Sequence, residues 1–319
     1  MDPAALPARG WDLDLGQLRA LRAAVDEGSL EAAARVLHVT PSAVSQRLRA
    51  LEVATGRVLL VRSRPVRATA SGQVLLRLAR QVELLAGDAL AELGGAGGGP
   101  AVPVLPVAVN ADSLATWVLP ALAPLAGSVA LDLHRDDEGR TADLLRAGTV
   151  VAAVTTEPEA VAGCSVTALG AARYRPVASV AFARRWLPGA LTGTADPAAL
   201  AAALPRAPVV VFDRADDLQH RWLRRVAGPG AAPPAHHVPA SADFLAAVHL
   251  GMGWGMLPDL QVGAGGPDER SGLVVLDPAG AVDVALHWQQ WKLRSPALDA
   301  VTRAVTDAAR RHLVPPGPA

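Results

Sequence analysis

The stretch Thr40–Glu52, TPSAVSQRLRALE, decides how the first part of the chain folds. On a helix, residues three and four positions apart share a face, so Val44, Leu48 and Leu51 form a narrow apolar stripe. The opposite stripe is short, polar and cationic, and consists of Ser42, Ser45, Gln46 and Arg49. The apolar stripe predicts packing on a core, and the polar stripe has to face something else.

Residues before this helix predict a helix-turn-helix pattern. Thr40 can cap the helix, with Pro41 at the first helical position, where its missing N–H costs nothing. Helical periodicity upstream begins at Leu15, and Gly28 is suited to end that helix. Ser29 can then cap a short helix, SLEAAARVLHV, which leaves a turn of a few residues before Thr40.

The segment after the helix predicts a wing and a long linker helix. RVLLVRSRPVRATA (57–70) alternates arginine with aliphatic residues around a proline, as expected of two short strands. A helix capped by Thr69 or Ser71 is expected to run to about residue 93. Its apolar positions step by three and four, and they are Leu75, Leu78, Val82, Leu85 and Ala89. That spacing is typical of a two-stranded coiled coil, the alternative being an amphipathic helix on its own domain.

Charge is unevenly distributed, although the whole chain balances 30 basic against 30 acidic residues. Between Ser29 and Arg80 nine arginines face two acids, which is typical of a module that binds anions. Serine and glutamine can reach base edges or phosphates, and arginine pairs with guanine or phosphate. The residues predicted to contact DNA are Ser42, Ser45, Gln46, Arg47 and Arg49 in the helix and Arg62, Arg64 and Arg67 in the wing.

The pattern changes beyond the glycine-rich stretch GGAGGGPA (94–101), which reads as a linker. Short aliphatic strands alternate with helices, predicting a two-lobed α/β body with a largely parallel sheet and a cleft. The expected fold is therefore α+β and multidomain. The expected parts are an N-terminal extension (1–13), a winged helix-turn-helix (14–69), a dimerisation linker helix (70–93), a hinge (94–101), an effector domain (102–312; lobe 1 about 102–173 and 273–312, lobe 2 about 174–272) and a tail (313–319).

Three stretches of the body predict an effector site. In VNADSLATWVLPAL (109–122), Asn110 or Asp112 can cap a helix whose first N–H groups suit a carboxylate. The stretches HRDDEGRT (134–141) and VVVFDRADDLQH (209–220) place acids at strand ends. One carboxylate receptor combined with several carboxylates suits a small zwitterion with an extra positive charge, such as a basic amino acid.

The predicted effector contacts are Ser113, Thr116, Glu138, Thr155 and Asp213. For Glu138, Asp213 and Thr155 a purely structural role stays equally open. For four other acids we favour a solvated loop or a helix cap over a ligand contact, and these are Asp112, Asp137, Asp216 and Asp217.

The residues GSLEAAARVLHVTPSAVSQRLRALEVATGRVLLVRSRPVRATASGQVLL (28–76) closely resemble the winged helix-turn-helix of LysR-type transcriptional regulators. The three effector stretches, with GMGWGMLPDLQ and VALHWQQW, resemble the ArgP/LysG subgroup of that family. The resemblance implies an effector domain like a periplasmic binding protein, a dimer through the linker helix, and dimers of dimers on double-stranded promoter DNA. It further implies control of RNA polymerase and of amino-acid export in response to lysine or arginine.

Other classes of function find little support in the sequence. A G-x-S-x-G elbow and an H-E-x-x-H motif are both missing, and the single cysteine, Cys164, rules out a cysteine metal site. We therefore expect no enzyme, metal or cofactor. Without an apolar run of about 18 residues or a signal-peptide core, a cytoplasmic protein is expected. A LysR-type regulator with a different effector, a solute-binding or enzymatic body with an incidental basic domain, and an architectural DNA binder stay open as alternatives.

Overall fold

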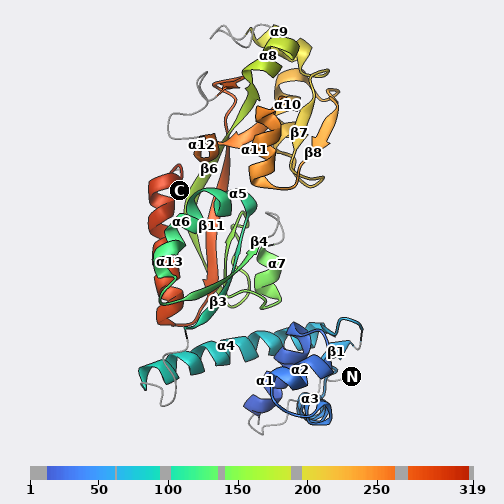
Figure 1. Cartoon of the computed structure of the whole chain (residues 1–319), viewed down its shortest axis with the longest axis vertical. Coiled ribbons are helices and arrows are strands. Elements are labelled where there is room, and N and C mark those ends of the chain that lie inside the picture. The colour runs from blue at the N-terminus through green and yellow to red at the C-terminus, as the bar shows by residue number, and fades with distance from the viewer. Residues whose placement is uncertain are drawn as a thin grey trace, which may run out of the picture.

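In the computed structural model, the chain folds into the predicted winged helix-turn-helix, long linker helix and two-lobed α/β domain (Figure 1). The structure describes residues 13–61, 63–93, 102–135, 141–187, 196–262 and 272–315. Several predicted features lie outside the described residues, namely most of the N-terminal extension, Arg62, the hinge 94–101, Asp137, Glu138 and residues 316–319 of the tail. Among the described helices, none is long and apolar enough to cross a membrane.

The DNA-binding domain consists of α1 (Leu15–Asp26), α2 (Leu30–Val36), α3 (Pro41–Thr55) and a wing of two antiparallel strands, β1 (Leu60–Val61) and β2 (Arg67–Ala68). The predicted caps are confirmed, because Ala32 N donates to Ser29 Oγ (3.1 Å) and Ala43 N donates to Thr40 Oγ1 (3.2 Å). Gly28 follows α1 with a φ of 70°, a conformation that favours glycine. Local capping chemistry therefore sets where these helices begin and end.

The apolar stripe of α3 is buried as predicted. Val44 and Leu51 are 0% exposed and Leu48 is 6% exposed, and all three belong to a core shared with α1, α2 and the linker helix. Glu52 Oε1, at the edge of the opposite face, accepts a hydrogen bond from Leu59 N (2.9 Å). This contact ties the end of α3 to the wing, so the polar stripe is held facing outward.

The linker helix α4 (Ala70–Glu92) begins where predicted, with Gly72 N donating to Thr69 Oγ1 (3.0 Å). The two halves of its predicted seam differ in burial. Leu75 is buried in the core of the DNA-binding domain, whereas Leu85 is 46% exposed. The first half therefore packs on its own domain, which was the alternative interpretation, and the second half leaves apolar surface available for a partner chain.

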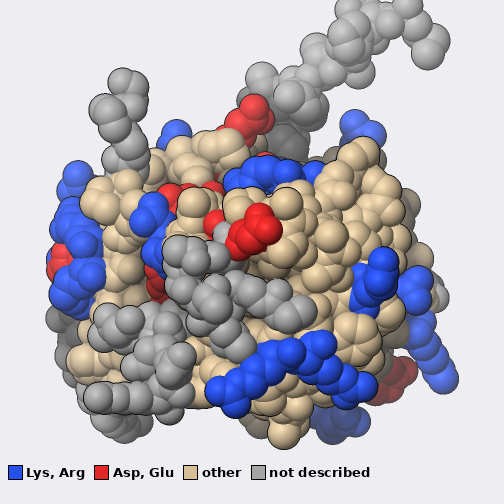
Figure 2. Space-filling model, turned by 90° about the horizontal axis from the view of Figure 1, so that it is seen from above, with Lys and Arg blue, Asp and Glu red and all other residues tan. Residues whose placement is uncertain are grey.

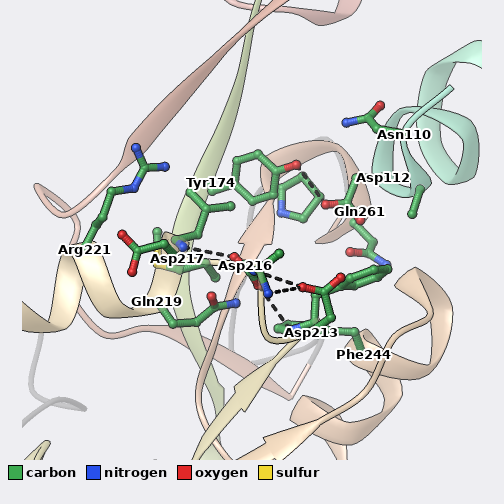
Figure 3. Close-up of a pocket in the computed structure, with 16 residues that line it drawn as sticks. Asn110, Asp112, Tyr174, Asp213, Asp216, Asp217, Gln219, Arg221, Phe244 and Gln261 are labelled. Atoms are coloured by element: carbon green, nitrogen blue, oxygen red, sulfur yellow. Dashed lines mark hydrogen bonds between the residues drawn. The ribbon is translucent and has the colours of Figure 1, made fainter. Parts of the chain in front are cut away.

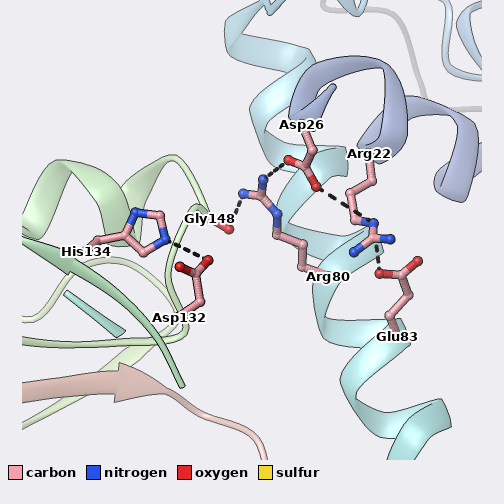
Figure 4. A network of polar contacts seen from close by, with 7 residues as sticks. All are labelled: Arg22, Asp26, Arg80, Glu83, Asp132, His134 and Gly148. Carbon is pink, nitrogen blue, oxygen red and sulfur yellow. Dashed lines mark hydrogen bonds and ion pairs between the residues drawn. The ribbon is translucent and has the colours of Figure 1, made fainter. Parts of the chain in front are cut away.

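A junction of polar contacts joins the linker helix to both neighbouring domains (Figure 4). Arg80 donates to the Asp26 carboxylate of α1 and to the Gly148 carbonyl of lobe 1, and Arg22 pairs with Glu83 at 3.0 Å. Gly148 has a φ of 70°, and a Cβ there would lie 2.8 Å from the Cβ of Arg77. The close approach of α4 to lobe 1 thus depends on a glycine at position 148.

Lobe 1 is built on three parallel strands, β3 (Val104–Val109), β4 (Ala130–Arg135) and β5 (Ala152–Thr155). Two long strands, β6 (Cys164–Ser179) and β11 (Val282–Trp291), continue the sheet in the order β6-β11-β5-β3-β4. The helical segments of the lobe are α5 (Ala111–Ser113), the π-helical turn η1 (Leu114–Val118), α6 (Leu119–Leu122), the 3-10 turn η2 (Ala123–Leu125), α7 (Thr141–Arg146) and α13 (Pro296–His312).

Lobe 2 is formed around the far end of β6, which pairs with β9 (Gly255–Pro258) and β10 (Leu273–Val275). A separate parallel pair consists of β7 (Val209–Val211) and β8 (Ala235–His237). The helices of this lobe are α8 (Val180–Trp186), α9 (Pro197–Ala203), α10 (Leu218–Ala227), α11 (Ser241–His249) and α12 (Asp259–Val262). Trp222 and Trp254 meet edge to face at its core, with ring centroids 4.9 Å apart.

Two expectations about the body need correction. The sheet is not largely parallel, because β6 and β11 connect the lobes in opposite directions and pair antiparallel with each other and with their other partners in this sheet. Lobe 2 also extends beyond the expected residue 272, because Leu273–Val275 pair with the lobe 2 end of β6.

Candidate DNA-binding face and effector pocket

The described residues that are predicted to contact DNA are all at least partly exposed on the DNA-binding domain. Ser42, Gln46 and Arg49 on α3 are exposed, and Ser45 and Arg47 are partly exposed. In the wing, Arg64 and Arg67 are exposed, while Arg62 is outside the described residues. The burial of the apolar stripe and the exposure of the polar stripe together give α3 the form of a recognition helix.

The basic side chains of this face are available to phosphates. Within the described part of the chain, Arg49, Arg64 and Arg67 form no ion pair, so their charge is not already neutralised. Figure 2 looks onto the opposite end of the molecule, at lobe 2, where basic side chains form several groups, one of them an unbroken band along the lower edge, beside acids and a large uncharged area.

A pocket of about 270 Å³ lies where the two lobes meet (Figure 3). Lobe 1 contributes the start of α5, and lobe 2 contributes the loop after β7, the first turn of α10, and parts of α11, β9 and α12. The polar residues that line it are Asn110, Asp112, Tyr174, Asp213, Asp216, Asp217, Gln219, Arg221 and Gln261. Four aspartates and one arginine leave the pocket with an excess of negative charge, which suits a cationic ligand.

Asp112 connects the two lobes at the back of this pocket. Its carboxylate accepts hydrogen bonds from Tyr174 on β6 (2.8 Å) and from Ser241 at the start of α11. Gln261 of α12 donates to the carbonyl of Ser241 (2.7 Å) and so extends the network. Burial raises the pKa of Asp112 above its ordinary value, while the two hydrogen bonds lower it and the charge of Asp216 raises it.

The acidic loop between β7 and α10 is held by its own side chains. Asp213 Oδ1 accepts from the backbone N–H groups of Ala215 (2.7 Å) and Asp216 (2.9 Å). Asp216 accepts from the N–H groups of Phe212 (3.1 Å) and Leu218 (3.0 Å). These bonds fix the two carboxylates at the pocket wall, so neither side chain has to become ordered when a ligand binds.

The structure brings only part of the predicted effector site together. Asp213 lines the pocket, whereas Ser113, Thr116 and Thr155 are not among the lining residues. Local backbone groups engage two of these hydroxyls, since Thr116 donates to the Asp112 carbonyl (2.6 Å) and Thr155 accepts from Glu157 N (3.1 Å). Ser113 is 2% exposed, and its contact with an effector stays a prediction.

The remaining acids differ in their surroundings. Asp217 is exposed and pairs with Arg224 at 2.9 Å, and Asp216 accepts backbone N–H groups at the start of α10, while both line the pocket. Asp112 is neither a solvated loop residue nor a cap, because side chains from lobe 2 hold it. Asp137 is outside the described residues.

Sequence reasoning missed four polar residues of the site, and these are Tyr174, Gln219, Arg221 and Gln261. Gln219 and Gln261 lie within two stretches that the sequence analysis quotes, VVVFDRADDLQH and GMGWGMLPDLQ. Only carboxylates were considered there as partners of a cationic ligand, and side-chain amides were not. Among the described residues, no group of three or more His, Cys, Asp or Glu side chains could hold a metal ion.

Comparison with known proteins gives matches over both parts of the chain. Residues 15–73 match the bacterial regulatory helix-turn-helix protein of the lysR family, and residues 101–310 match the LysR substrate binding domain. The lysine export transcriptional regulatory protein LysG of Corynebacterium glutamicum is 40% identical over 302 residues, which cover 94% of this chain and 99% of LysG.

Two solved structures resemble the whole chain. The crystal structure of ArgP from Mycobacterium tuberculosis is 43% identical, with a TM-score of 0.83 and coverage of 96% of this chain and 100% of that one. Full-length LysG from Corynebacterium glutamicum with bound effector arginine is 38% identical, with a TM-score of 0.75 and coverage of 95% and 100%.

Proposed function

Because this chain belongs to the LysR family of bacterial transcriptional regulators, we propose that it controls a promoter in response to a basic amino acid, lysine or arginine. The observation that carries this proposal is the acidic pocket between the lobes, in a chain similar to a LysG that binds arginine. The pocket binds the amino acid and releases it unchanged. The regulated gene is one for amino-acid export, in line with the name of the Corynebacterium relative, a lysine export transcriptional regulatory protein.

The ligand's groups find complementary partners across the pocket. Its side-chain cation faces the loop that carries Asp213 and Asp216, where the carboxylates are fixed by backbone bonds. Its α-carboxylate faces the start of α5, near Asn110 and Ser113, where the first N–H groups of the helix point toward it. A ligand that touches both lobes stabilises one relative placement of them more than another, which is the requirement for any shift in conformation.

The readout of that shift is the arrangement of α3 on DNA. Two chains associate through the exposed second half of α4, and two such dimers occupy half-sites about one helical turn or a multiple apart. Effector binding changes the spacing of the recognition helices and so the engagement of RNA polymerase with the promoter.

Isothermal titration calorimetry with lysine, arginine, histidine and norleucine tests the proposed ligand class. We expect lysine or arginine to bind at least tenfold more tightly than norleucine, because burial beside several carboxylates favours a cation. Equal affinities for all four amino acids would remove the proposal that the effector is basic.

Substitution of Arg49 tests the proposed recognition helix. Arg49→Ala is expected to weaken promoter binding by about tenfold or more, since it removes a base or phosphate contact. Fluorescence anisotropy with a promoter fragment, repeated over a salt series, measures the affinity and its salt slope. Arg303→Ala, which removes the same charge from an exposed position on α13, is the control and is expected to bind like the natural chain. If the two variants bind equally, α3 is not the recognition helix.

A further inference from the structure

Gln219 is a buried amide that lines the effector pocket. It lies in the first turn of α10 and is only 2% exposed. Within the described part of the chain its Oε1 is buried and has no hydrogen-bond partner. Buried polar atoms in native proteins almost always have a partner, so an acceptor left over at a pocket wall indicates a group that arrives with a ligand.

The position of Gln219 relates this acceptor to the acidic loop. Figure 3 shows its amide directed from α10 toward Asp216 and Asp213. The two carboxylates supply charge, but four backbone N–H groups of the loop and helix start already donate to three of their four oxygens, namely Oδ1 of Asp213 and both oxygens of Asp216. Gln219 adds an acceptor to this wall without adding a further negative charge.

We propose that Gln219 determines specificity for the effector's cationic side chain, by accepting a hydrogen bond from it with Oε1. This inference rests on the proposed function, because it assumes that a basic amino acid occupies the pocket. A lysine ammonium offers three donors and an arginine guanidinium offers five, so either can satisfy Oε1 while its charge faces Asp213 and Asp216.

The same acceptor excludes neutral amino acids of similar size. A site built around a buried acceptor discriminates strongly against a ligand without the matching donor, because only a ligand with that donor gives the acceptor a partner. Norleucine has the length of lysine without its amine. Its rejection by the natural chain should therefore depend on Gln219 as well as on the acids.

Calorimetry on the full-length chain and two variants tests this role. Gln219→Met keeps the length of the side chain and removes the acceptor, and it is expected to reduce the preference for lysine over norleucine by at least tenfold. The reduction should come mainly from weaker lysine binding. Gln219→Glu keeps an oxygen at the same place and is expected to retain the preference, which also keeps the inference testable if the methionine variant does not fold.

The outcomes separate this inference from the proposed function. If the natural chain itself binds lysine and arginine no better than norleucine, the proposed function fails, and the role of Gln219 fails with it. If the natural chain prefers lysine but Gln219→Met keeps that preference, or weakens both ligands equally, only the role of Gln219 is overturned. Loss of the preference in Gln219→Glu would overturn it too.

Discussion

Replacement of Gly72 by alanine is expected to weaken binding to promoter DNA by a hundredfold or more. A Cβ at this position would lie 2.0 Å from the backbone oxygen of Leu59 and 3.0 Å from its carbonyl carbon. Both sides of this contact are main chain, so no side chain can rotate to make room. The start of α4 must therefore move away from the strand that leads into the wing.

The movement would break the contacts that set the position of the wing. Thr69 N donates to the same Leu59 oxygen (2.9 Å), and Thr69 Oγ1 donates to the carbonyl of Val58 (2.7 Å). Leu59 is itself 1% exposed and part of the domain core. We expect a loss of unfolding free energy of about 2–4 kcal/mol and a fall in promoter affinity of a hundredfold or more.

Gly87→Ala is the matched control, because it makes the same change on the same helix. Within the described residues of the single chain, no atom lies within 4 Å of a Cβ at Gly87, so this alanine should stabilise the helix of the monomer by up to about 1 kcal/mol. Denaturant unfolding and anisotropy with a promoter fragment measure both variants. If Gly72→Ala binds DNA as Gly87→Ala does, the wing does not depend on this close approach.

Asp112→Asn is expected to stabilise the folded chain at neutral pH while weakening the binding of lysine. An asparagine can keep polar contacts with Tyr174 and Ser241, but it carries no charge that burial would penalise. The ligand, in contrast, loses the carboxylate at the start of α5, which in the proposed pose faces its α-ammonium group. Coulombic attraction across a partly buried site is strong enough for a loss of about 10- to 100-fold in affinity.

The stabilisation should depend on pH in a defined direction. Burial raises the pKa of Asp112 in the folded chain above the ordinary value of 3.8. Ionisation is therefore less favourable in the folded chain, and stability is lost as the pH rises through the folded pKa. The increase in unfolding free energy from Asp112→Asn should be present at pH 7. It should disappear below the ordinary pKa of 3.8, where residue 112 is uncharged in both the natural chain and the variant.

Denaturant unfolding across a pH series measures that gain, and calorimetry measures the affinity for lysine. Asp217→Asn provides the control, since Asp217 is an exposed pocket residue whose charge is shared with Arg224. It should change stability little at any pH. A gain from Asp112→Asn that is the same at all pH values would show that desolvation of the carboxylate is not its cause.

The local features of the DNA-binding domain could be predicted because their partners lie a few residues away. Thr40 caps the helix that begins at the next residue, and Val44, Leu48 and Leu51 follow from the helical period alone. Glycine-ended and serine-capped helices depend on the same short-range chemistry. The sequence therefore predicts the α3 face almost residue by residue.

The pocket could be predicted only as a class of site. Asp112 meets Tyr174 and Ser241, which lie 62 and 129 positions further along the chain, and no local pattern reports such pairs. The hydroxyl groups of Thr116 and Thr155 were predicted to contact the effector, and that contact stays a prediction. In the structure, nearby backbone groups already form hydrogen bonds with both. The antiparallel pairing of β6 and β11 could not be predicted either, because the sequence pattern of a strand does not indicate which other strand it pairs with.

The contact between α4 and lobe 1 has a consequence for hybrid regulators, in which the DNA-binding domain and linker helix of one protein are joined to the effector domain of another. Arg80 donates hydrogen bonds to Asp26 of the DNA-binding domain and to the Gly148 carbonyl of the effector domain. Arg77 lies against the same glycine. A foreign effector domain joined after residue 93 would place its own residue at the position of Gly148. Unless that residue is a glycine in the same left-handed conformation, the foreign effector domain would lie further from α4. It would then lose its contacts with the DNA-binding domain.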